Sequence, residues 1–285
     1  MTINVNRLVQ QAVWDTPMED IREAMKEQVA KVHKYLTAFN EILKDRLKAK
    51  LLPVYDAGFV ALEKQYLTVG INGLIEGAES LGIDIDPENE EYVAYVNAVL
   101  QPIYEANRAA HTKEIMLNTE LIPAESLGVK NAKWDKADNL YVPRDRYNSY
   151  FFRSEDPTVS VLDKLKLHGR EFTRYLDGGS ACHINLDEHL SKAQYLLLLD
   201  VAIQTGCSYF TFNIPNTLCK DCGHISKHRL DRCPKCESDN LDYATRIIGY
   251  LKLVSRFARD RQIEEKTRHY AHGLEGNTNE DHPKP

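Results

Sequence analysis

Apolar residues recur at steps of three or four from residue 17 to residue 51 and predict one long amphipathic helix. Thr16 occupies the position of a capping residue, with Pro17 at the first helical position and Glu19 in the first turn. The periodic apolar residues are Ile21, Met25, Val29, Val32, Leu36, Phe39 and Leu43. Such a stripe favours packing against a core, and in a helix of this length it also suits a subunit interface. The pattern ends before Pro53.

Short apolar runs alternate with helical patterns further along the chain. Residues 67–74 predict a strand that turns into a short helix, and residues 88–110 predict a helix kinked at Pro102. Residues 115–122 predict a strand that is followed by a turn and a helical start. Residues 134–152 are aromatic and polar without a clear period, which indicates an ordered loop.

A second group of alternating elements follows. A glycine turn at residues 177–181 leads into a predicted strand at residues 182–186. The leucine-rich residues 193–203 predict a helix that Gly206 ends, and residues 209–214 alternate in the manner of a strand. Strands and helices that alternate along a chain are typical of an α/β fold.

Four of the six cysteines form two CxxC pairs. They are Cys219, Cys222, Cys233 and Cys236, with ten residues between the pairs. Structural zinc sites use four ligands in a tetrahedron, and Gly223 and Pro234 suit two tight turns that present the thiolates. Two disulfides are the alternative. Residues 1–11 lack the apolar region of a secretory signal, and no run approaches the ~18 apolar residues of a membrane span. A cytoplasmic chain with reduced thiols, no membrane contact and structural zinc is therefore expected.

A zinc module that binds nucleic acid is a further alternative. Five basic residues lie in and around the cysteine array, at Lys220, Lys227, Arg229, Arg232 and Lys235. The whole chain, however, has 36 basic and 42 acidic residues and a net charge of −6. This balance disfavours a protein dedicated to nucleic acids, so no direct nucleic-acid partner is expected.

Gly249 lies thirteen residues after the last cysteine of the array, inside the apolar run Arg246-Ile-Ile-Gly-Tyr250. A glycine in a strand-like run is most often a turn or bulge residue. A glycine loop close to a four-thiolate array instead suggests a glycyl-radical enzyme whose radical loop is braced by zinc.

Several segments together resemble a known family. They are residues 66–74 (YLTVGINGL), 118–120 (NTE), 123–126 (PAES), 177–180 (DGGS), 211–213 (TFN), the four cysteines and 245–251 (TRIIGYL). Over residues 1–270 the chain resembles the C-terminal half of an anaerobic, class III ribonucleoside-triphosphate reductase. The pairing of the cysteine array with the RIIGYL segment is the most specific part of the resemblance.

The resemblance implies a fold. We expect half of a ten-stranded α/β barrel with helices outside, then a small four-cysteine zinc module and a C-terminal radical loop. The expected boundaries are residues 1–215 for the half-barrel region, 216–240 for the zinc module, 241–270 for the radical loop and terminal helix, and 271–285 for a disordered tail.

The resemblance also implies the chemistry. Gly249 would store a radical after a radical S-adenosylmethionine activating enzyme removes a hydrogen atom from its Cα. The glycyl radical would convert a cysteine to a thiyl that attacks the 3' position of a ribonucleoside triphosphate, and the products would be deoxyribonucleotides for DNA synthesis. Glu120, Glu125 and Ser126 are candidate substrate residues by segment similarity.

The family's thiyl cysteine precedes the segment that matches residues 67–74, whereas the first cysteine here is Cys182. The sequence therefore predicts that a separate N-terminal half supplies that cysteine. The resemblance further implies that the assembled enzyme is a dimer. An inactive remnant or a spare glycyl-radical domain is one alternative. A zinc-ribbon binding protein is another.

Overall fold

A computed structural model describes residues 1–123, 125–246 and 251–272, and it divides them between two compact units. Unit 1 contains residues 1–151 and 171–180, and unit 2 contains residues 152–170 and the chain from residue 181 onward. Gly249 and the tail beyond residue 272 lie outside the described residues.

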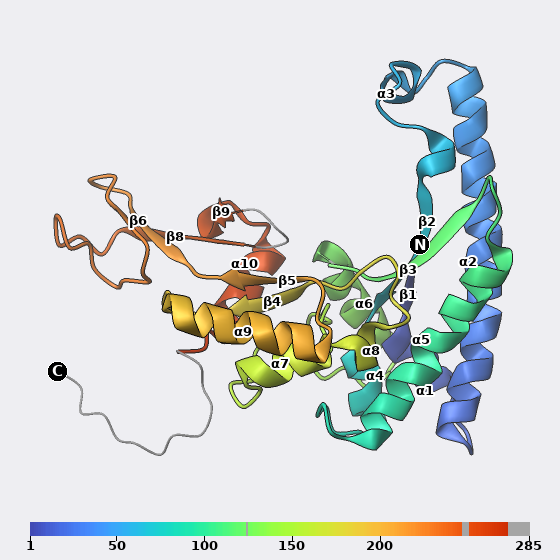
Figure 1. Ribbon diagram of the computed structural model, residues 1–285, viewed down its shortest axis with the longest axis horizontal. Coiled ribbons are helices and arrows are strands. Elements are labelled where there is room, and N and C mark those ends of the chain that lie inside the picture. The colour runs from blue at the N-terminus through green and yellow to red at the C-terminus, as the bar shows by residue number, and fades with distance from the viewer. Residues whose placement is uncertain (124, 247–250, 273–285) are drawn as a thin grey trace. The chain divides into compact units, whose positions relative to one another are not determined.

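Unit 1 is built on a parallel sheet in the order β1-β2-β3 (Figure 1). Its strands are β1 (Thr2–Asn4), β2 (Tyr66–Asn72) and β3 (Met116–Leu121). Its longer helices are α1 (Val5–Ala12), α2 (Pro17–Lys48), α4 (Leu74–Ser80), α5 (Glu90–Ala110) and α6 (Glu125–Ala137). The short elements are α3 (Pro53–Asp56), η1 (Leu62–Lys64) and α8 (Arg170–Thr173), which crosses from unit 2 into unit 1. The predicted strand–helix alternation of this region is confirmed.

The long predicted helix is confirmed as α2, which runs beside α5 (Figure 1). Its first five periodic apolar residues are buried, whereas Phe39, the sixth, is 53% exposed. The stripe therefore packs on the core only along the N-terminal part of the helix. The helix ends at Lys48, before the predicted limit, because Lys50 adopts a positive φ of 60°.

The loop predicted for residues 134–152 is wrong at its start, because α6 extends to Ala137. Asn131 and Asp135 lie one helical turn apart, and both are buried and bonded to distant polar side chains. These long-range contacts favour helix beyond what the local pattern indicates.

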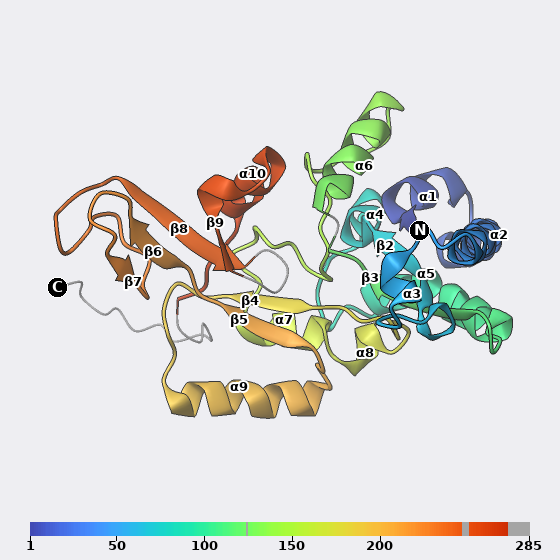
Figure 2. The same cartoon turned by 90° about the horizontal axis from the view of Figure 1, so that it is seen from above.

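Unit 2 combines a parallel strand pair with an antiparallel sheet (Figure 2). The parallel pair is β4 (Cys182–Asn185) and β5 (Phe210–Asn213), accompanied by α7 (Val161–Leu167) and α9 (Lys192–Thr205). The antiparallel sheet has the order β7 (Ile225–Ser226), β6 (Asn216–Cys219), β8 (Leu241–Arg246) and β9 (Leu251–Leu253). The short η2 (Val254–Arg256) and α10 (Arg259–Thr267) follow.

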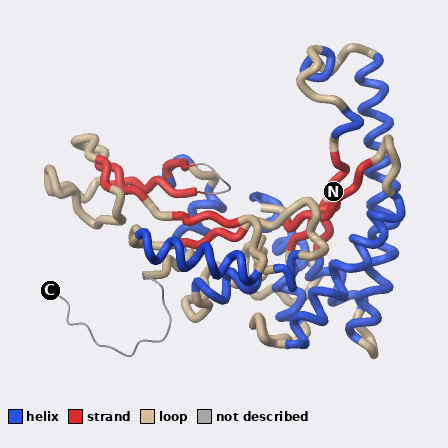
Figure 3. Tube along the Cα trace, viewed as in Figure 1, coloured by secondary structure: helices blue, strands red, loops and turns tan. Residues whose placement is uncertain are grey.

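The predicted helix before β5 is confirmed as α9, which ends at Gly206 with φ 76°. Tyr195 of α9 packs against Phe212 of β5, with ring centroids 5.0 Å apart. The described parallel strands form one small sheet in each unit (Figure 3). The structure thus has a mixed α/β fold, and the half-barrel stays a prediction.

Candidate functional site

The four cysteines of the CxxC pairs meet in unit 2, at one end of the antiparallel sheet. Their Sγ atoms all lie within 4.8 Å of one another. The Sγ atoms of Cys219 and Cys236 are 3.5 Å apart, and those of Cys222 and Cys233 are 3.6 Å apart. A disulfide bond measures about 2.05 Å, so these thiols are free. Zn–S bonds of about 2.3 Å give a tetrahedron with edges of roughly 3.8 Å, so the cluster has the dimensions of a zinc site.

Each CxxC pair is folded into a similar turn. The N–H of Gly223 donates to the carbonyl oxygen of Cys219 at 3.0 Å, and the N–H of Glu237 donates to that of Cys233 at 2.9 Å. Both donors follow the second cysteine of their pair and have positive φ, 71° at Gly223 and 57° at Glu237. Glycine adopts this conformation freely, whereas Glu237 adopts it at a cost. Two similar turns facing one another provide four thiolates with no further residue needed.

Polar contacts hold the two turns together. Asp221 of the first turn accepts hydrogen bonds from the Ser238 hydroxyl and from Nδ2 of Asn240, the latter at 2.7 Å. These two bonds lower the pKa of Asp221. In the second turn, desolvation opposes ionisation of Cys233, but the N–H groups of Lys235 and Cys236 lower the pKa of this thiol to about 7. The Cys236 thiol shifts the other way: although the N–H of Ser238 bonds to it, contacts with the neighbouring thiols raise its pKa to about 12. A metal ion would therefore have to displace protons from the cluster to bind all four sulfurs as thiolates.

The strand that leads to Gly249 is paired with the strand that leads into the cysteine cluster. Cys219 ends β6 and is in register with Leu241 at the start of β8. At the other end of β8, Arg246 is in register with Leu251 of β9. The four residues between them, which include Gly249, thus connect two paired antiparallel strands. We call the paired residues 244–246 and 251–253 the β8–β9 stem.

Arg229 links the cysteine array to the C-terminal helix. Its guanidinium lies over the rings of Tyr243 and Tyr270, 4.6 and 5.5 Å from their centroids, and Nη1 is 3.1 Å from a carboxylate oxygen of Glu265. The Tyr270 hydroxyl is in turn 3.3 Å from Oγ1 of Thr245, in the β8–β9 stem. The cysteine array and the stem are therefore in contact through side chains as well as through the sheet.

The candidate substrate residues lie in unit 1, at the end of β3. Glu120 is half-buried, and burial raises its pKa. It is in register with Gly70 of β2 and forms a bridge with Gly179. Ser126 is exposed in the first turn of α6. Glu125 begins α6, and its side chain lies outside the described structure. The fold thus brings Glu120 and the start of α6 to the same end of β3.

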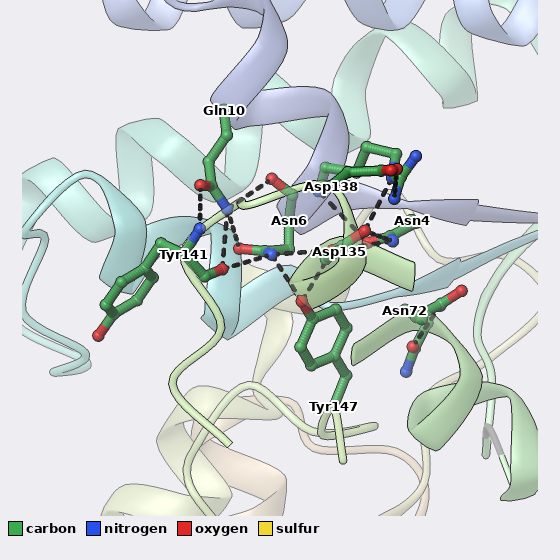
Figure 4. Close-up of polar contacts among 10 residues, drawn as sticks. Asn4, Asn6, Gln10, Asn72, Asp135, Asp138, Tyr141 and Tyr147 are labelled. Atoms are coloured by element: carbon green, nitrogen blue, oxygen red, sulfur yellow. Dashed lines mark hydrogen bonds and ion pairs between the residues drawn. The ribbon is translucent and has the colours of Figure 1, made fainter. Parts of the chain in front are cut away.

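A buried polar cluster fixes α6 in unit 1 (Figure 4). Asp135 of α6 accepts hydrogen bonds from Nδ2 of Asn4 and Asn6, at 2.9 and 3.0 Å. It also accepts from the Tyr147 hydroxyl at 2.7 Å and from Nε of Arg7 at 2.8 Å. Burial and the bond to Asp135 raise the pKa of Tyr147, so this hydroxyl stays protonated and donates.

Sequence reasoning missed a set of asparagines at strand ends. The parallel strands β1, β2, β4 and β5 each end in asparagine, at Asn4, Asn72, Asn185 and Asn213. These asparagines are in register in pairs, Asn4 with Asn72 and Asn185 with Asn213. The signal was present in the sequence as Thr-Ile-Asn, Gly-Ile-Asn, His-Ile-Asn and Thr-Phe-Asn. We call these four residues the strand-end asparagines.

Within the described residues, no helix is long and apolar enough to cross a membrane. A family model described as anaerobic ribonucleoside-triphosphate reductase matches residues 1–270. No match was found among curated proteins.

Solved structures of anaerobic ribonucleotide reductases are similar to this chain. One matches with a TM-score of 0.85 and 30% identity over 96% of this chain and 44% of its own. The enzyme from Thermotoga maritima in complex with dATP and CTP matches with a TM-score of 0.80 and 28% identity, over 94% of this chain and 44% of its own. The same enzyme with glycerol in the active site matches with a TM-score of 0.79 and 29% identity, over 93% of this chain and 44% of its own. The chain thus spans less than half the length of these proteins.

Proposed function

The chain belongs to the family of anaerobic ribonucleoside-triphosphate reductases, and we propose that it is the radical-bearing part of such an enzyme. In the proposed reaction the 2' hydroxyl of a ribonucleoside triphosphate leaves as water, and an electron donor outside this chain supplies the two electrons that give the deoxyribonucleotide. The observation that supports this role most directly is the pairing of β8, the strand before Gly249, both with β6, which ends at Cys219, and with β9, the strand after Gly249.

Gly249 is proposed to store the radical on its Cα. A radical S-adenosylmethionine activating enzyme removes one Cα hydrogen atom, and the unpaired electron is delocalised over the adjacent amide nitrogen and carbonyl. The Gly249 radical then takes a hydrogen atom from a cysteine thiol, which becomes a thiyl, and the thiyl takes the 3' hydrogen atom of the ribose. Glycine suits this role because a side chain would hinder planarity and close approach.

The thiyl cysteine is proposed to come from a segment outside these 285 residues, whichever polypeptide contains it. The two cysteines outside the array, Cys182 and Cys207, are both buried in unit 2. Burial raises the pKa of Cys182, and its contact with Cys207 lowers the pKa of the latter. The chain is proposed to contribute half of a ten-stranded barrel that this other segment completes, in an enzyme that acts as a cytoplasmic dimer.

The cysteine array is proposed to hold a structural zinc ion through Cys219, Cys222, Cys233 and Cys236. Four thiolates fill a tetrahedral site and leave no position for substrate, so the metal would supply rigidity only. Glu120, Glu125 and Ser126 are proposed to contact substrate from the end of β3.

The experiment that tests the radical role is electron spin resonance. We expect a doublet signal when the chain is incubated without oxygen with an activating enzyme of this class, S-adenosylmethionine and a reductant. The single hydrogen left on Cα produces the doublet, so glycine deuterated at Cα should collapse it to a singlet. Gly249→Ala should abolish the signal.

Gly58→Ala serves as the matched control, because it alters a glycine of unit 1 that has open space for a methyl group, and it leaves the cysteine array and Gly249 intact. An undiminished doublet in Gly249→Ala would refute the assignment. Admission of oxygen after activation should cut the chain at Gly249, which a zinc-ribbon binding protein without a radical would not undergo.

A further inference from the structure

Asn213 is buried at the end of β5, and its side-chain amide makes three hydrogen bonds. Oδ1 accepts from the hydroxyl of Thr245 and from the backbone N–H of Arg246, both at 2.9 Å. Nδ2 donates to Oδ1 of Asn185, the neighbouring strand-end asparagine, at 2.8 Å. The orientation of the amide follows from this pattern, because a backbone N–H can only donate and must face the oxygen. Asn213 thus connects the parallel pair of unit 2 to the last two residues of β8.

Arg246 is the last described residue before Gly249, and buried side chains hold both of its backbone polar groups. Asn213 accepts from its N–H, and Nη1 of Arg268 donates to its carbonyl oxygen at 3.1 Å. Arg268 is itself fixed by Glu264, with Nη2 2.7 Å from a carboxylate oxygen, and both of these side chains are buried. Thr245, which also donates to Asn213, is fully buried.

We propose that Asn213 is a positioning residue for the radical, which fixes the point at which β8 leads into the residues around Gly249. The inference rests on the proposed function, because it assumes that Gly249 forms the radical. A glycyl radical must stay at a fixed distance from the thiol with which it exchanges hydrogen, and small displacements of reacting groups have large effects on rate. Asn213 acts three residues before Gly249 through the backbone of Arg246, without touching the radical itself.

Asn72 offers a matched control in unit 1. It too is a fully buried strand-end asparagine, and its side-chain amide both accepts and donates a hydrogen bond. Its Oδ1 accepts from Nδ2 of Asn131 at 2.8 Å, and its Nδ2 donates to the carbonyl oxygen of Asn148 at 3.1 Å. If strand-end asparagines only stabilise the fold, Asn72→Ala and Asn213→Ala should have similar effects on every readout.

The test compares three variants of the full chain under the activating conditions described above, with spin resonance as the readout. In Asn213→Ala, we expect the spins per chain to fall about tenfold, or the doublet to decay about tenfold faster, because Arg246 loses its acceptor. Asn213→Asp keeps an oxygen that can accept from Arg246 but loses the donor to Asn185, so it should restore part of the signal. Asn72→Ala should keep the wild-type spin yield, doublet splitting and decay rate. Bound zinc and the thermal unfolding midpoint of each variant are measured in the same preparations.

The outcomes separate the two proposals. A wild-type chain that gives no doublet at Gly249 refutes the proposed function and this inference with it. A wild-type doublet that is unchanged in folded, zinc-loaded Asn213→Ala refutes only the role of Asn213. Equal losses of signal in Asn213→Ala and Asn72→Ala, or no rescue by Asn213→Asp, would also refute it, because a general loss of stability would then explain the effect.

Discussion

Two parallel strands in each unit end with asparagine, and the two units use this residue differently. In unit 1, Asn4 contacts the carboxylate of Asp135, while Asn72 accepts from Asn131, so both hold α6. In unit 2, Asn213 holds the β8–β9 stem through neutral groups only. Segments that follow parallel strands pack at the carboxyl ends of those strands. An asparagine at such an end can both donate and accept, so it can form hydrogen bonds with different neighbouring segments. The same local signature thus fixes a candidate substrate segment in one unit and a candidate radical segment in the other.

Removal of metal should produce the largest difference in stability between the two units. If zinc occupies the cysteine array, a strong chelator should cost unit 2 a binding free energy on the order of 10 kcal/mol, while unit 1 keeps its stability. Hydrogen exchange measured by mass spectrometry should show lost protection in β6 and β8 and none in β2. Re-addition of zinc should restore it. Equal loss of protection in both units would contradict the assignment of the array as a local structural site.

Substitution of the buried carboxylate Asp135 should have the reverse effect, because it should destabilise unit 1 more than unit 2. Asp135→Ala leaves Asn4, Asn6 and Tyr147 without their acceptor and Arg7 without a buried partner, so unit 1 should lose about 3–5 kcal/mol of unfolding free energy. Asp138→Ala removes the other, exposed partner of Arg7 and should cost at most about 1 kcal/mol. Denaturant unfolding followed by hydrogen exchange in α6 measures both. Similar losses in the two variants would show that the buried cluster adds little.

Acid should weaken unit 2 before unit 1. Burial and the nearby Arg268 lower the pKa of His183 to about 4, and burial lowers that of His168 to about 3. The unfolded chain takes up these protons near pH 6.5 and the folded chain does not, so stability falls as pH drops below about 6.5. By pH 5, each of these two histidines should lower the free energy of unfolding by about 2 kcal/mol.

Unit 1 contains a buried group, Glu76, whose protonation has the opposite effect on stability. Burial raises the pKa of Glu76, so its protonation on acidification favours the folded state. Unfolding midpoints between pH 7 and pH 5 test the contrast, and His183→Gln together with His168→Gln should flatten the decline. A decline that persists in the double variant would place its origin elsewhere.

The smallest effect should come from stacked arginines. Arg229 lies over two tyrosine rings and pairs with the buried Glu265. Arg174 in unit 1 lies over one ring, that of Tyr175, 5.0 Å from its centroid, and its polar partners are Asn97 and the exposed Glu171. Arg229→Lys should cost about 1 kcal/mol, and Arg174→Lys about half as much, because lysine stacks less well. Thermal unfolding of the two variants ranks them, and the reverse order would contradict the linking role of Arg229.

The sequence predicted those parts of the molecule that depend on local pattern. The apolar stripe of α2 and the Gly206 terminus of α9 follow from neighbouring residues, and the cysteine cluster follows from spacing. The extension of α6 could not be predicted, because it depends on bonds from Asp135 to residues about 130 positions away. The contacts of Asn213 could not be predicted for the same reason, since its partners lie on β4 and β8. Local patterns specify elements, whereas polar contacts between their ends emerge only from the fold.

The register of β8 with β9 determines what happens to a chain that is cut. A nick between Arg246 and Leu251 leaves one new end on each of two strands that are still paired. The C-terminal piece also stays attached through Arg268 to the carbonyl oxygen of Arg246, and through Glu265 and Tyr270 to Arg229. If the proposed radical forms at Gly249 and oxygen cuts the chain there, the product should therefore run as two bands under denaturing conditions and as one particle under native conditions.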